Sequence, residues 1–421
     1  MIELSSRFKK WLLNSPIRLL ISSSVCSQLI TLFATPFITR IYLPEQIGVV
    51  SIFISFTTLF STFASLRYTS ALLVNSDDNE MNTLFSLSLL LVLPISLLGA
   101  LALYIFALND VFGFSSLPSH ATIFAFLTIF LLGLAALQRQ ILLRFGDFHV
   151  IAVYNSFKSV FNVSLRLLGY LSSYKLMYLI ISEFIAALAS CIVLLSRRIS
   201  LWNQWFELKF ESLKLTAWRW KRFPLLEVPS LFFDQISAAA PLFLLNTQYS
   251  PSFVGFYVIA QRIAFLPNTH LGSAISDVFQ SKYSSYIRNL DFPASDQLFK
   301  RYFYRLVSTS IVLYFPLALI ARYSLTFLLG EEWLEVSLII PWIAAWSATS
   351  LVASTLSPVL NILKKQEFKY LYDIAIFSAL VASFSLSSGT NYSTTIALVS
   401  MANITANLLY TVVISSLALK H

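Results

Sequence analysis

The stretch NTLFSLSLLLVLPISLLGALALYIFA, residues 82–107, decides the fold class of this 421-residue chain. It runs for 26 positions without a charged side chain, and about 20 mostly apolar residues are enough for a helix to cross a bilayer. Within such a helix every backbone polar group is satisfied by the segment itself. We therefore interpret residues 82–107 as a membrane-spanning helix.

The rest of the chain has the same character. Charged residues make up 12% of it and apolar residues 57%, with a mean hydropathy of +0.74, whereas soluble domains carry roughly 25% charged residues. The sequence predicts an all-α polytopic membrane protein with about twelve spans. Besides 82–107, these cover approximately residues 18–39, 46–67, 119–140, 150–172, 175–195, 223–246, 252–277, 303–325, 335–358, 368–387 and 393–417.

The basic residues predict the orientation of these spans. With both termini in the cytoplasm, 23 of the 29 Lys and Arg residues lie in inner segments and only three in outer ones. Cytoplasmic loops of membrane proteins carry this excess. Because the cations are dispersed between apolar runs, we expect no nucleic-acid partner.

Two features predict an organisation in two halves. YLPEQIG at residues 42–48 matches YSPSFVG at 249–255, an offset of 207, and residues 200–222 have the aromatic, amphipathic pattern of a helix lying in the membrane interface. We expect a six-helix lobe at 1–199, an interfacial linker at 200–222 and a second six-helix lobe at 223–421. In transporters built from repeats, the substrate site lies between the halves near mid-membrane, so we expect a central cavity there.

The fifth predicted span carries a polar face with two cations. Asn155, Lys158, Asn162 and Arg166 lie within roughly 60° of one another around a helix, and Lys158 is about 12 Å from Arg166 along the axis. A lipid-facing cation is costly, so both should point into the bundle or a wet cavity. We predict substrate binding here, with a structural polar contact as the alternative.

The seventh span carries two carboxylates on one face. Asp234 and Arg262, on the next span, fall near mid-membrane, where an ion pair would remove two lone charges. Glu227 has no evident cationic partner in the sequence, so it is our first candidate for ion coupling and Asp234 the second. Serine and threonine stripes, such as Ser51 to Thr69 on span two and Ser347 to Ser357 on span ten, are typical either of a polar cavity or of close helix packing.

Several kinds of chemistry have no counterpart in the sequence. The ten glycines include no Gly-Lys-Ser/Thr, so the chain has no Walker A loop of its own. The four histidines are scattered without metal-ligand spacing. Cys26 and Cys191 both lie inside apolar runs, which excludes a disulfide framework. We expect no metal, no other cofactor and no catalytic residue.

TPFITRIYLPEQIGVVSIF, Thr35–Phe53, and FFDQISAAAPLFLLNTQYSPSFVGFYVIAQRIAFLP, Phe232–Pro267, resemble the polysaccharide biosynthesis family. This is the O-antigen flippase branch of the multidrug/oligosaccharidyl-lipid/polysaccharide exporter (MOP) superfamily. The resemblance implies a bacterial inner-membrane flippase. It would carry an undecaprenyl-pyrophosphate-linked oligosaccharide from the cytoplasmic to the periplasmic leaflet by alternating access. The match reaches Asp234, Arg262 and Arg67, and we expect the two arginines to contact substrate.

The resemblance also implies partners: the lipid-linked oligosaccharide, membrane lipids, and the polymerase and chain-length proteins of the same pathway. One alternative is a multidrug antiporter of the same superfamily, which would be expected to use carboxylates for organic cations. Another is a membrane enzyme, a polymerase or ligase acting on lipid-linked glycan. Such an enzyme would need a sizeable outer loop, and the longest outer segments predicted here, Leu108–Pro118 and Tyr323–Leu334, are about a dozen residues. We therefore expect a transporter.

Overall fold

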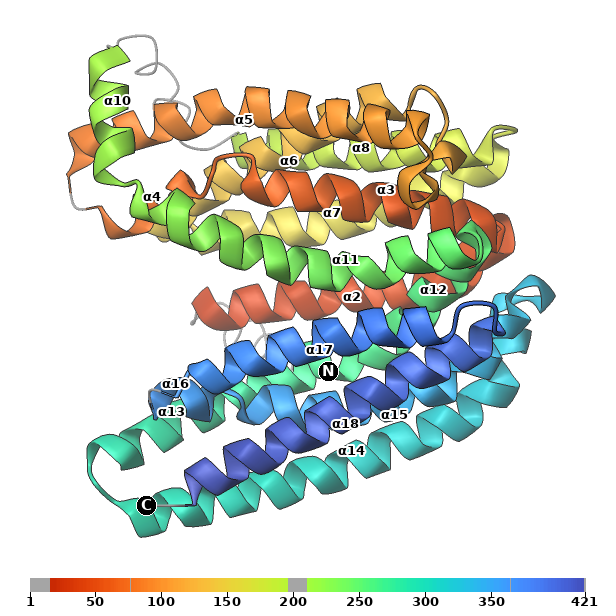
Figure 1. The fold of residues 1–421 in the computed structure, drawn as a ribbon. Helices are drawn as coiled ribbons and strands as arrows, with labels where there is room; N and C mark the ends of the chain where they lie inside the picture. Colours follow the sequence, from red (N-terminus) through yellow and green to blue (C-terminus); the bar gives the residue numbers. More distant parts are fainter. Residues whose placement is uncertain (1–15, 76, 196–209, 364, 420–421) are drawn as a thin grey trace, which may run out of the picture. The chain divides into compact units, whose positions relative to one another are not determined.

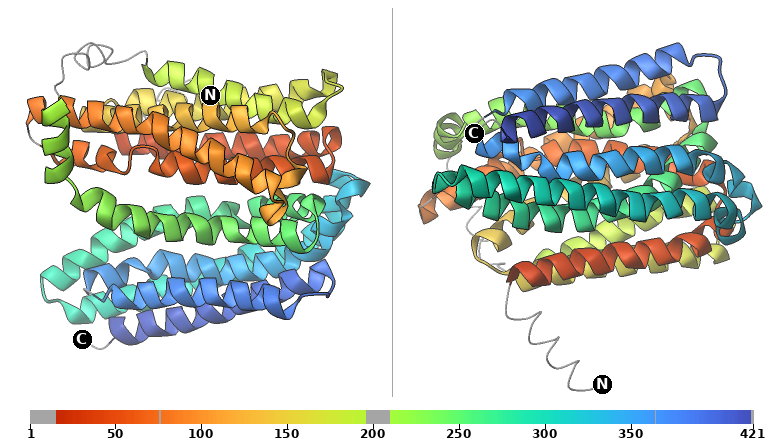
Figure 2. Two further views of the ribbon diagram at one scale, coloured as in Figure 1. Left: turned by 45° about the horizontal axis from the view of Figure 1, so that its top comes forward. Right: turned by 90° about the horizontal axis from the view of Figure 1, so that it is seen from below.

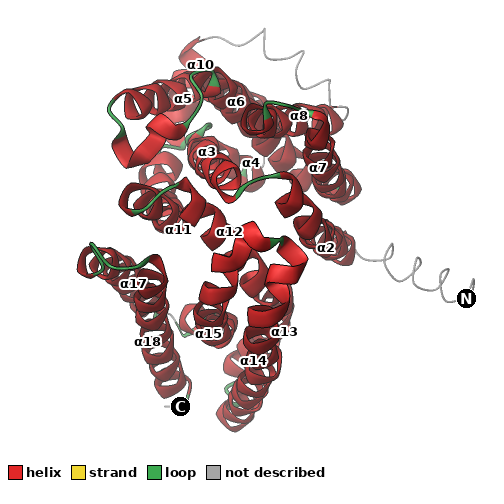
Figure 3. Ribbon diagram, turned by 90° about the vertical axis from the view of Figure 1, so that its right-hand side faces the viewer, coloured by secondary structure: helices red, strands yellow, loops and turns green. Residues whose placement is uncertain are grey.

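The computed structural model describes residues 16–75, 77–195, 210–363 and 365–419. Helices account for nearly all of these residues, and no strand occurs among them (Figure 3). The all-α prediction is confirmed. By their contacts the residues divide into two compact units, Met1–Val254 (unit 1) and Gly255–His421 (unit 2), which we describe separately.

Unit 1 is built from long helices joined by short turns (Figure 1). α6 packs against both α5 and α8, and α7 packs against both α2 and α8. The helices of this unit are α2 (Pro16–Ile41), α3 (Pro44–Phe63), α4 (Tyr68–Val74), α5 (Asp78–Leu108), η1 (Val111–Ser116), α6 (Ala121–Arg144), α7 (Phe148–Leu168), η2 (Gly169–Leu171), α8 (Lys175–Leu195), α10 (Phe210–Arg219), η4 (Phe223–Glu227) and α11 (Val228–Gln248).

Unit 2 begins within α12 (Pro251–Pro267). In it α15 packs against both α14 and α18, and α17 packs against α18 (Figure 2). Phe279, Tyr283, Phe299, Leu356 and Ile414 belong to its buried apolar core. The remaining helices are η5 (Asn268–Gly272), α13 (Ser273–Arg288), α14 (Phe292–Leu329), η6 (Glu331–Trp333), α15 (Leu334–Leu356), α16 (Pro358–Ile362), α17 (Glu367–Leu386) and α18 (Tyr392–Ala418).

Ten helical segments in the described ranges are long and apolar enough to cross a membrane. Each overlaps one of the twelve spans expected from the sequence. The other two expected spans correspond to α7 and α12, which form as helices. α7 is 21 residues long but carries Asn155, Lys158, Asn162 and Arg166 along one face. α12 has only 17 residues, the last of which is Pro267. The protein is therefore a multi-pass membrane protein in which α7 is unusually polar.

The described part of the expected interfacial linker is α10, which packs against α5. Leu213 is buried, and the Tyr68 hydroxyl donates to the carbonyl of Ala217 at 3.1 Å. Glu80 at the start of α5 accepts from Arg219 Nη1 at 2.8 Å and from Trp220 Nε1 at 3.1 Å. The hydrogen bond from Arg219 to this carboxylate raises the pKa of the guanidinium above its ordinary value. Residues 200–209 lie outside the described ranges, and the division into two six-helix lobes stays a prediction.

Candidate functional site

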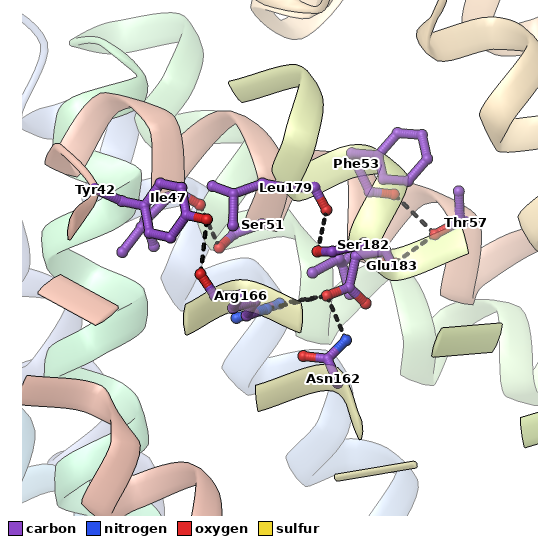
Figure 4. A network of polar contacts seen from close by, with 11 residues as sticks. Tyr42, Ile47, Ser51, Phe53, Thr57, Asn162, Arg166, Leu179, Ser182 and Glu183 are labelled. Atoms are coloured by element: carbon purple, nitrogen blue, oxygen red, sulfur yellow. Dashed lines mark hydrogen bonds and ion pairs between the residues drawn. The ribbon is translucent and has the colours of Figure 1, made fainter. Parts of the chain in front are cut away.

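The polar face of α7 meets one carboxylate of α8. Asn162 Nδ2 donates to Glu183 Oε1 at 2.8 Å, and Arg166 donates to the same oxygen from Nε at 3.2 Å and from Nη2 at 2.5 Å (Figure 4). The Arg166 and Glu183 side chains are only 12% and 16% exposed. A low-dielectric environment strengthens such charge-assisted bonds. The structure therefore places Arg166 and Asn162 in a buried clamp between two helices.

Tyr42, between α2 and α3, fixes the C-terminal end of α7 from the other side. Its hydroxyl donates to the Arg166 carbonyl at 2.8 Å, and burial raises its pKa to about 12, so it stays a neutral donor. Gly169 makes this approach feasible, because a Cβ there would lie 1.6 Å from the Tyr42 hydroxyl oxygen. Lys175 Nζ donates to the Ile41 carbonyl at 2.9 Å, which joins the start of α8 to the end of α2.

Lys158 differs from Arg166 although both belong to the same predicted face. It is half-buried, and within the described ranges it makes no hydrogen bond or ion pair, although it is near enough to Glu183 to interact with it electrostatically. One turn before it, the Asn155 carbonyl accepts from Ser27 Oγ of α2 at 3.0 Å, so the backbone of α7 is held at this level too. The face thus contains a satisfied cation, Arg166, and a cation with its donors free, Lys158.

Glu183 is the residue that sequence reasoning underrated. It is not among the site residues predicted from the sequence, and yet it is the acceptor for both Asn162 and Arg166. A usable signal was present: Glu183 is the only carboxylate within residues 175–195, and the cations of the preceding span needed a partner. An opposite charge on the next helix is the simplest way to bury them.

A second ion pair corrects our expectation for Glu227. This carboxylate has a cationic partner, because Arg67 Nε donates to its Oε2 at 3.0 Å. Ser70 Oγ donates to the same oxygen at 2.9 Å. The two charged side chains are 27% and 36% exposed, about twice as open as the Arg166–Glu183 pair. Two predicted site residues, Arg67 and Glu227, therefore form an ion pair with each other, which the sequence did not predict.

The backbone around the second pair is irregular on both sides. Leu66 and Arg67 have φ of 46° and 63°, in the left-handed region that side chains other than glycine rarely adopt. These residues separate α3 from α4, and Ser70 lies in the first turn of α4. Glu227 ends η4, a turn of π-helix directly before α11. Strained and π-helical positions cluster at functional sites, which makes this pair a candidate moving part.

The remaining predicted site residues lie on α11 and α12. Asp234 is exposed on α11 in unit 1, whereas Arg262 is half-buried on α12 in unit 2. Their pairing stays a prediction. On α15 the predicted serine stripe takes part in helix packing: Ser347 is fully buried, its hydroxyl donates to the Ala264 carbonyl at 3.0 Å, and its Oγ lies 3.2 Å from the Tyr314 hydroxyl oxygen.

A family model described as "Polysaccharide biosynthesis protein" matches residues 37–338. The chain belongs to this polysaccharide biosynthesis protein family. The resemblance seen in Thr35–Phe53 and Phe232–Pro267 is thereby confirmed, and both pairs described above lie within the matched region. A comparison with curated proteins finds no match.

Solved structures share the fold of this polysaccharide biosynthesis family member. An inward-facing multidrug resistance MATE transporter of the MOP superfamily aligns with a TM-score of 0.71 at 14% identity, covering 93% of this chain and 94% of its own. The lipid II flippase MurJ in an inward closed conformation aligns with a TM-score of 0.70 at 16% identity, covering 94% and 87%. A MOP superfamily transporter from Pyrococcus furiosus gives 0.57 at 13%, covering 96% and 95%. The fold is that of the MOP transporters.

Proposed function

We propose that the protein is a flippase that moves an undecaprenyl-pyrophosphate-linked oligosaccharide from the cytoplasmic to the periplasmic leaflet of a bacterial inner membrane. The observation that carries the proposal is the half-buried Lys158, whose donors are free, on a span of a polysaccharide biosynthesis family member. An intramembrane cation is a functional-site hypothesis by default. A pyrophosphate is the anionic group of this substrate class, and no covalent chemistry is required to move it.

Within this proposal the two cations of α7 have different tasks. Lys158 attracts the pyrophosphate or an acidic sugar, since its ammonium donates no hydrogen bond within the described ranges and Glu183, which it attracts electrostatically, is already bound by Arg166. Arg166 acts as a positioning residue: its guanidinium is occupied by Glu183, and it holds α7 against α8. Asn155 and Asn162 supply hydrogen bonding on the same face, and we propose that Arg262 contributes charge from α12. This division of roles replaces the simpler expectation that Lys158 and Arg166 both bind substrate.

We propose that Arg67 and Glu227 couple transport to an ion. In one transport state the Glu227 carboxylate would bind a proton or a sodium ion. In the other, which is the state observed, it pairs with Arg67 and accepts a hydrogen bond from Ser70. Asp234 is the second candidate. Voltage contributes in any case, because a group with about two negative charges gains roughly 4.6 kcal/mol on moving outward across 100 mV. In proteoliposomes, Glu227→Gln should abolish the response to a pH or sodium gradient and preserve the response to voltage.

A cellular experiment tests the substrate class. Removing the protein should cause a lipid-linked oligosaccharide to accumulate on the cytoplasmic leaflet, and expression of the native chain should clear it. Lys158→Ala at normal protein level should fail to clear it, whereas Lys158→Arg should clear most of it because the charge is kept. If no lipid-linked sugar accumulates, the substrate class is wrong.

A second candidate function is export of organic cations, which the likeness to a MATE transporter favours. In that function Glu227 and Asp234 would bind the organic cation, and Lys158 would be dispensable. Resistance to cationic dyes, lost in Asp234→Asn and retained in Lys158→Ala, would support it over the flippase. For both functions we propose transport without a catalytic step. The polymerase and chain-length proteins of the pathway are proposed partners only of the flippase.

A further inference from the structure

Helix α14 in unit 2 has two different faces along its 38 residues. One face is buried. Its residues recur at intervals of four or seven, which keeps them on one side of an α-helix; they are Phe299, Leu306, Ser310, Tyr314 and Ala321. The opposite face is open, with exposed fractions between 61% and 79% at the most open positions. These are Tyr304, Ile311, Val312, Phe315, Ile320, Tyr323 and Phe327.

The open face of α14 has the dimensions of the hydrocarbon layer. No charged residue occurs between Arg305 and Arg322, and Tyr304 and Tyr323 bound the apolar stretch about 28 Å apart at 1.5 Å per residue. The hydrocarbon core of a bilayer is about 30 Å thick, and tyrosines concentrate at its two interfaces. The open face therefore faces lipid, and Tyr304 marks the headgroup level at one end.

A basic cluster lies at the level of Tyr304. Lys300, Arg301 and Arg305 are all exposed, and their spacing puts Arg301 and Arg305 on the same side of α14 as the lipid-facing residues and Lys300 at the edge of that side. The neighbouring helix α13, which packs against α14, adds the exposed residues Lys282 and Arg288. Within the described ranges none of the five makes an ion pair. Two acids lie nearby. Asp291 is exposed and caps α14 by accepting from the Ala294 backbone N–H at 3.1 Å. Asp296, one turn before Lys300, is half-buried, and its Oδ1 has no hydrogen-bond partner within the described ranges.

The cations at the start of α17 provide a contrast within unit 2. Lys369 pairs with Asp373 at 2.8 Å, and Lys365 lies 4.0 Å from Glu367. Those two cations carry their own counter-charges, whereas within the described ranges the five cations of the α13–α14 cluster form no ion pair with Asp291 or Asp296 and can bind anions from outside the chain. Next to a lipid-facing tyrosine, the available anions are the phosphates of lipid headgroups.

We propose that the α13–α14 cluster is a binding surface for anionic phospholipid headgroups, with Lys300, Arg301 and Arg305 contacting the phosphate and Tyr304 lying at the boundary with the acyl chains. Such a surface would anchor unit 2 at one leaflet and make the protein sensitive to lipid composition. It does not depend on the transported substrate, so it stands or falls separately from the proposed function.

The test uses the full chain with a fluorophore beside the cluster. In a Cys26→Ser background, Ser308→Cys on the exposed face of α14 carries bimane, and the protein is reconstituted in phosphatidylcholine bilayers. Quenching by nitroxide-labelled phosphatidylglycerol is compared with quenching by nitroxide-labelled phosphatidylcholine. We expect phosphatidylglycerol to be enriched at this position, with the enrichment lost at high salt because exposed charges are screened.

Two double variants of equal charge change make the comparison specific. Lys300→Gln with Arg305→Gln should lower the enrichment on the order of fivefold or more, as expected from the attraction of each basic side chain to an anionic surface. Lys365→Gln with Lys369→Gln should leave it unchanged. Equal quenching by both lipids in the native chain, or an equal fall in both variants, would overturn the proposal. If the first variant does not fold, the salt dependence of the native chain decides.

A last arm distinguishes the source of the phosphate. Unlabelled undecaprenyl pyrophosphate is added at one molecule per protein. For a phospholipid surface, the quenching by labelled phosphatidylglycerol should stay the same. Displacement at this ratio would assign the cluster to the transported lipid and contradict the phospholipid assignment.

Discussion

Two Arg–Glu pairs in unit 1 differ in what surrounds them. Arg166–Glu183 is buried, and three donor groups converge on one carboxylate oxygen beside the Tyr42 contact. Arg67–Glu227 is more open and lies on irregular backbone. The first pair is difficult to separate, because each charge would be left buried without a partner. In the second pair, water can hydrate both charged groups when they separate. We therefore regard the first as structural and the second as able to change partners.

Glu183→Gln should destabilise the protein, because it leaves the buried Arg166 guanidinium without a counter-charge. Breaking a buried pair costs about 3 kcal/mol or more, which should be visible as a lower melting temperature in detergent. The double variant Arg166→Met, Glu183→Leu should recover much of the loss by removing both charges. An unchanged melting temperature in Glu183→Gln would show that the pair contributes nothing.

Gly169→Ala should displace Tyr42, because the new Cβ would lie 1.6 Å from its hydroxyl oxygen. Overpacking of this kind costs about 1–3 kcal/mol. Tyr42→Phe in the same chain removes the clashing oxygen and should restore part of the stability. If Gly169→Ala alone melts like the native protein, the end of α7 is less constrained than the structure indicates.

The sequence predicted single residues better than their partners. The 3.6-residue period placed Asn162 and Arg166 on one face correctly. It did not assign Glu183 to them, since a period contains no information on which neighbouring helix faces that side. Arg67 and Glu227 are 160 positions apart in the sequence, and Arg67 lies in the break between α3 and α4. No local sequence pattern predicts either this break or this contact.

At the level of elements, the irregular features are the left-handed residues before α4 and the π-helical turn before α11. They are tied together through Arg67, Ser70 and Glu227. Hydropathy predicted α11, because a long apolar run is sufficient for that, but it did not predict the short helix α4. It also placed the end of the expected span at residue 67, whereas α3 ends at Phe63 and the left-handed residues Leu66 and Arg67 follow.

Removing this tie should loosen both elements together. Glu227→Gln and Arg67→Ala should each speed hydrogen exchange in residues 66–70 and 223–228, and the double variant should add little, because both changes break one contact. An open pair is worth up to about 1 kcal/mol, a factor of roughly five in exchange rate. Lys369→Ala, at an exposed pair in α17, is the matched control and should have no effect there. Additive effects would show that the two residues act independently.

At the level of the whole molecule, composition alone predicted an all-α multi-pass membrane protein, and the family and fold comparisons confirm it. The polarity of α7 within an otherwise apolar chain remains the feature that points to function.

The central cavity stays a prediction: cysteines at Ser55, Asn162 and Asp234 should all react with a small charged maleimide in membranes. Protection of all three would contradict it.

The most direct test of the central claim is transport by the purified protein in proteoliposomes with an inside-negative potential. The native chain should move an undecaprenyl-pyrophosphate-linked oligosaccharide to the outer leaflet. Lys158→Ala should reduce the initial rate at least about tenfold, the value of one hydrogen bond to a charged group, and Lys158→Arg should retain most of it. Full transport by Lys158→Ala, at equal reconstitution, would contradict the account.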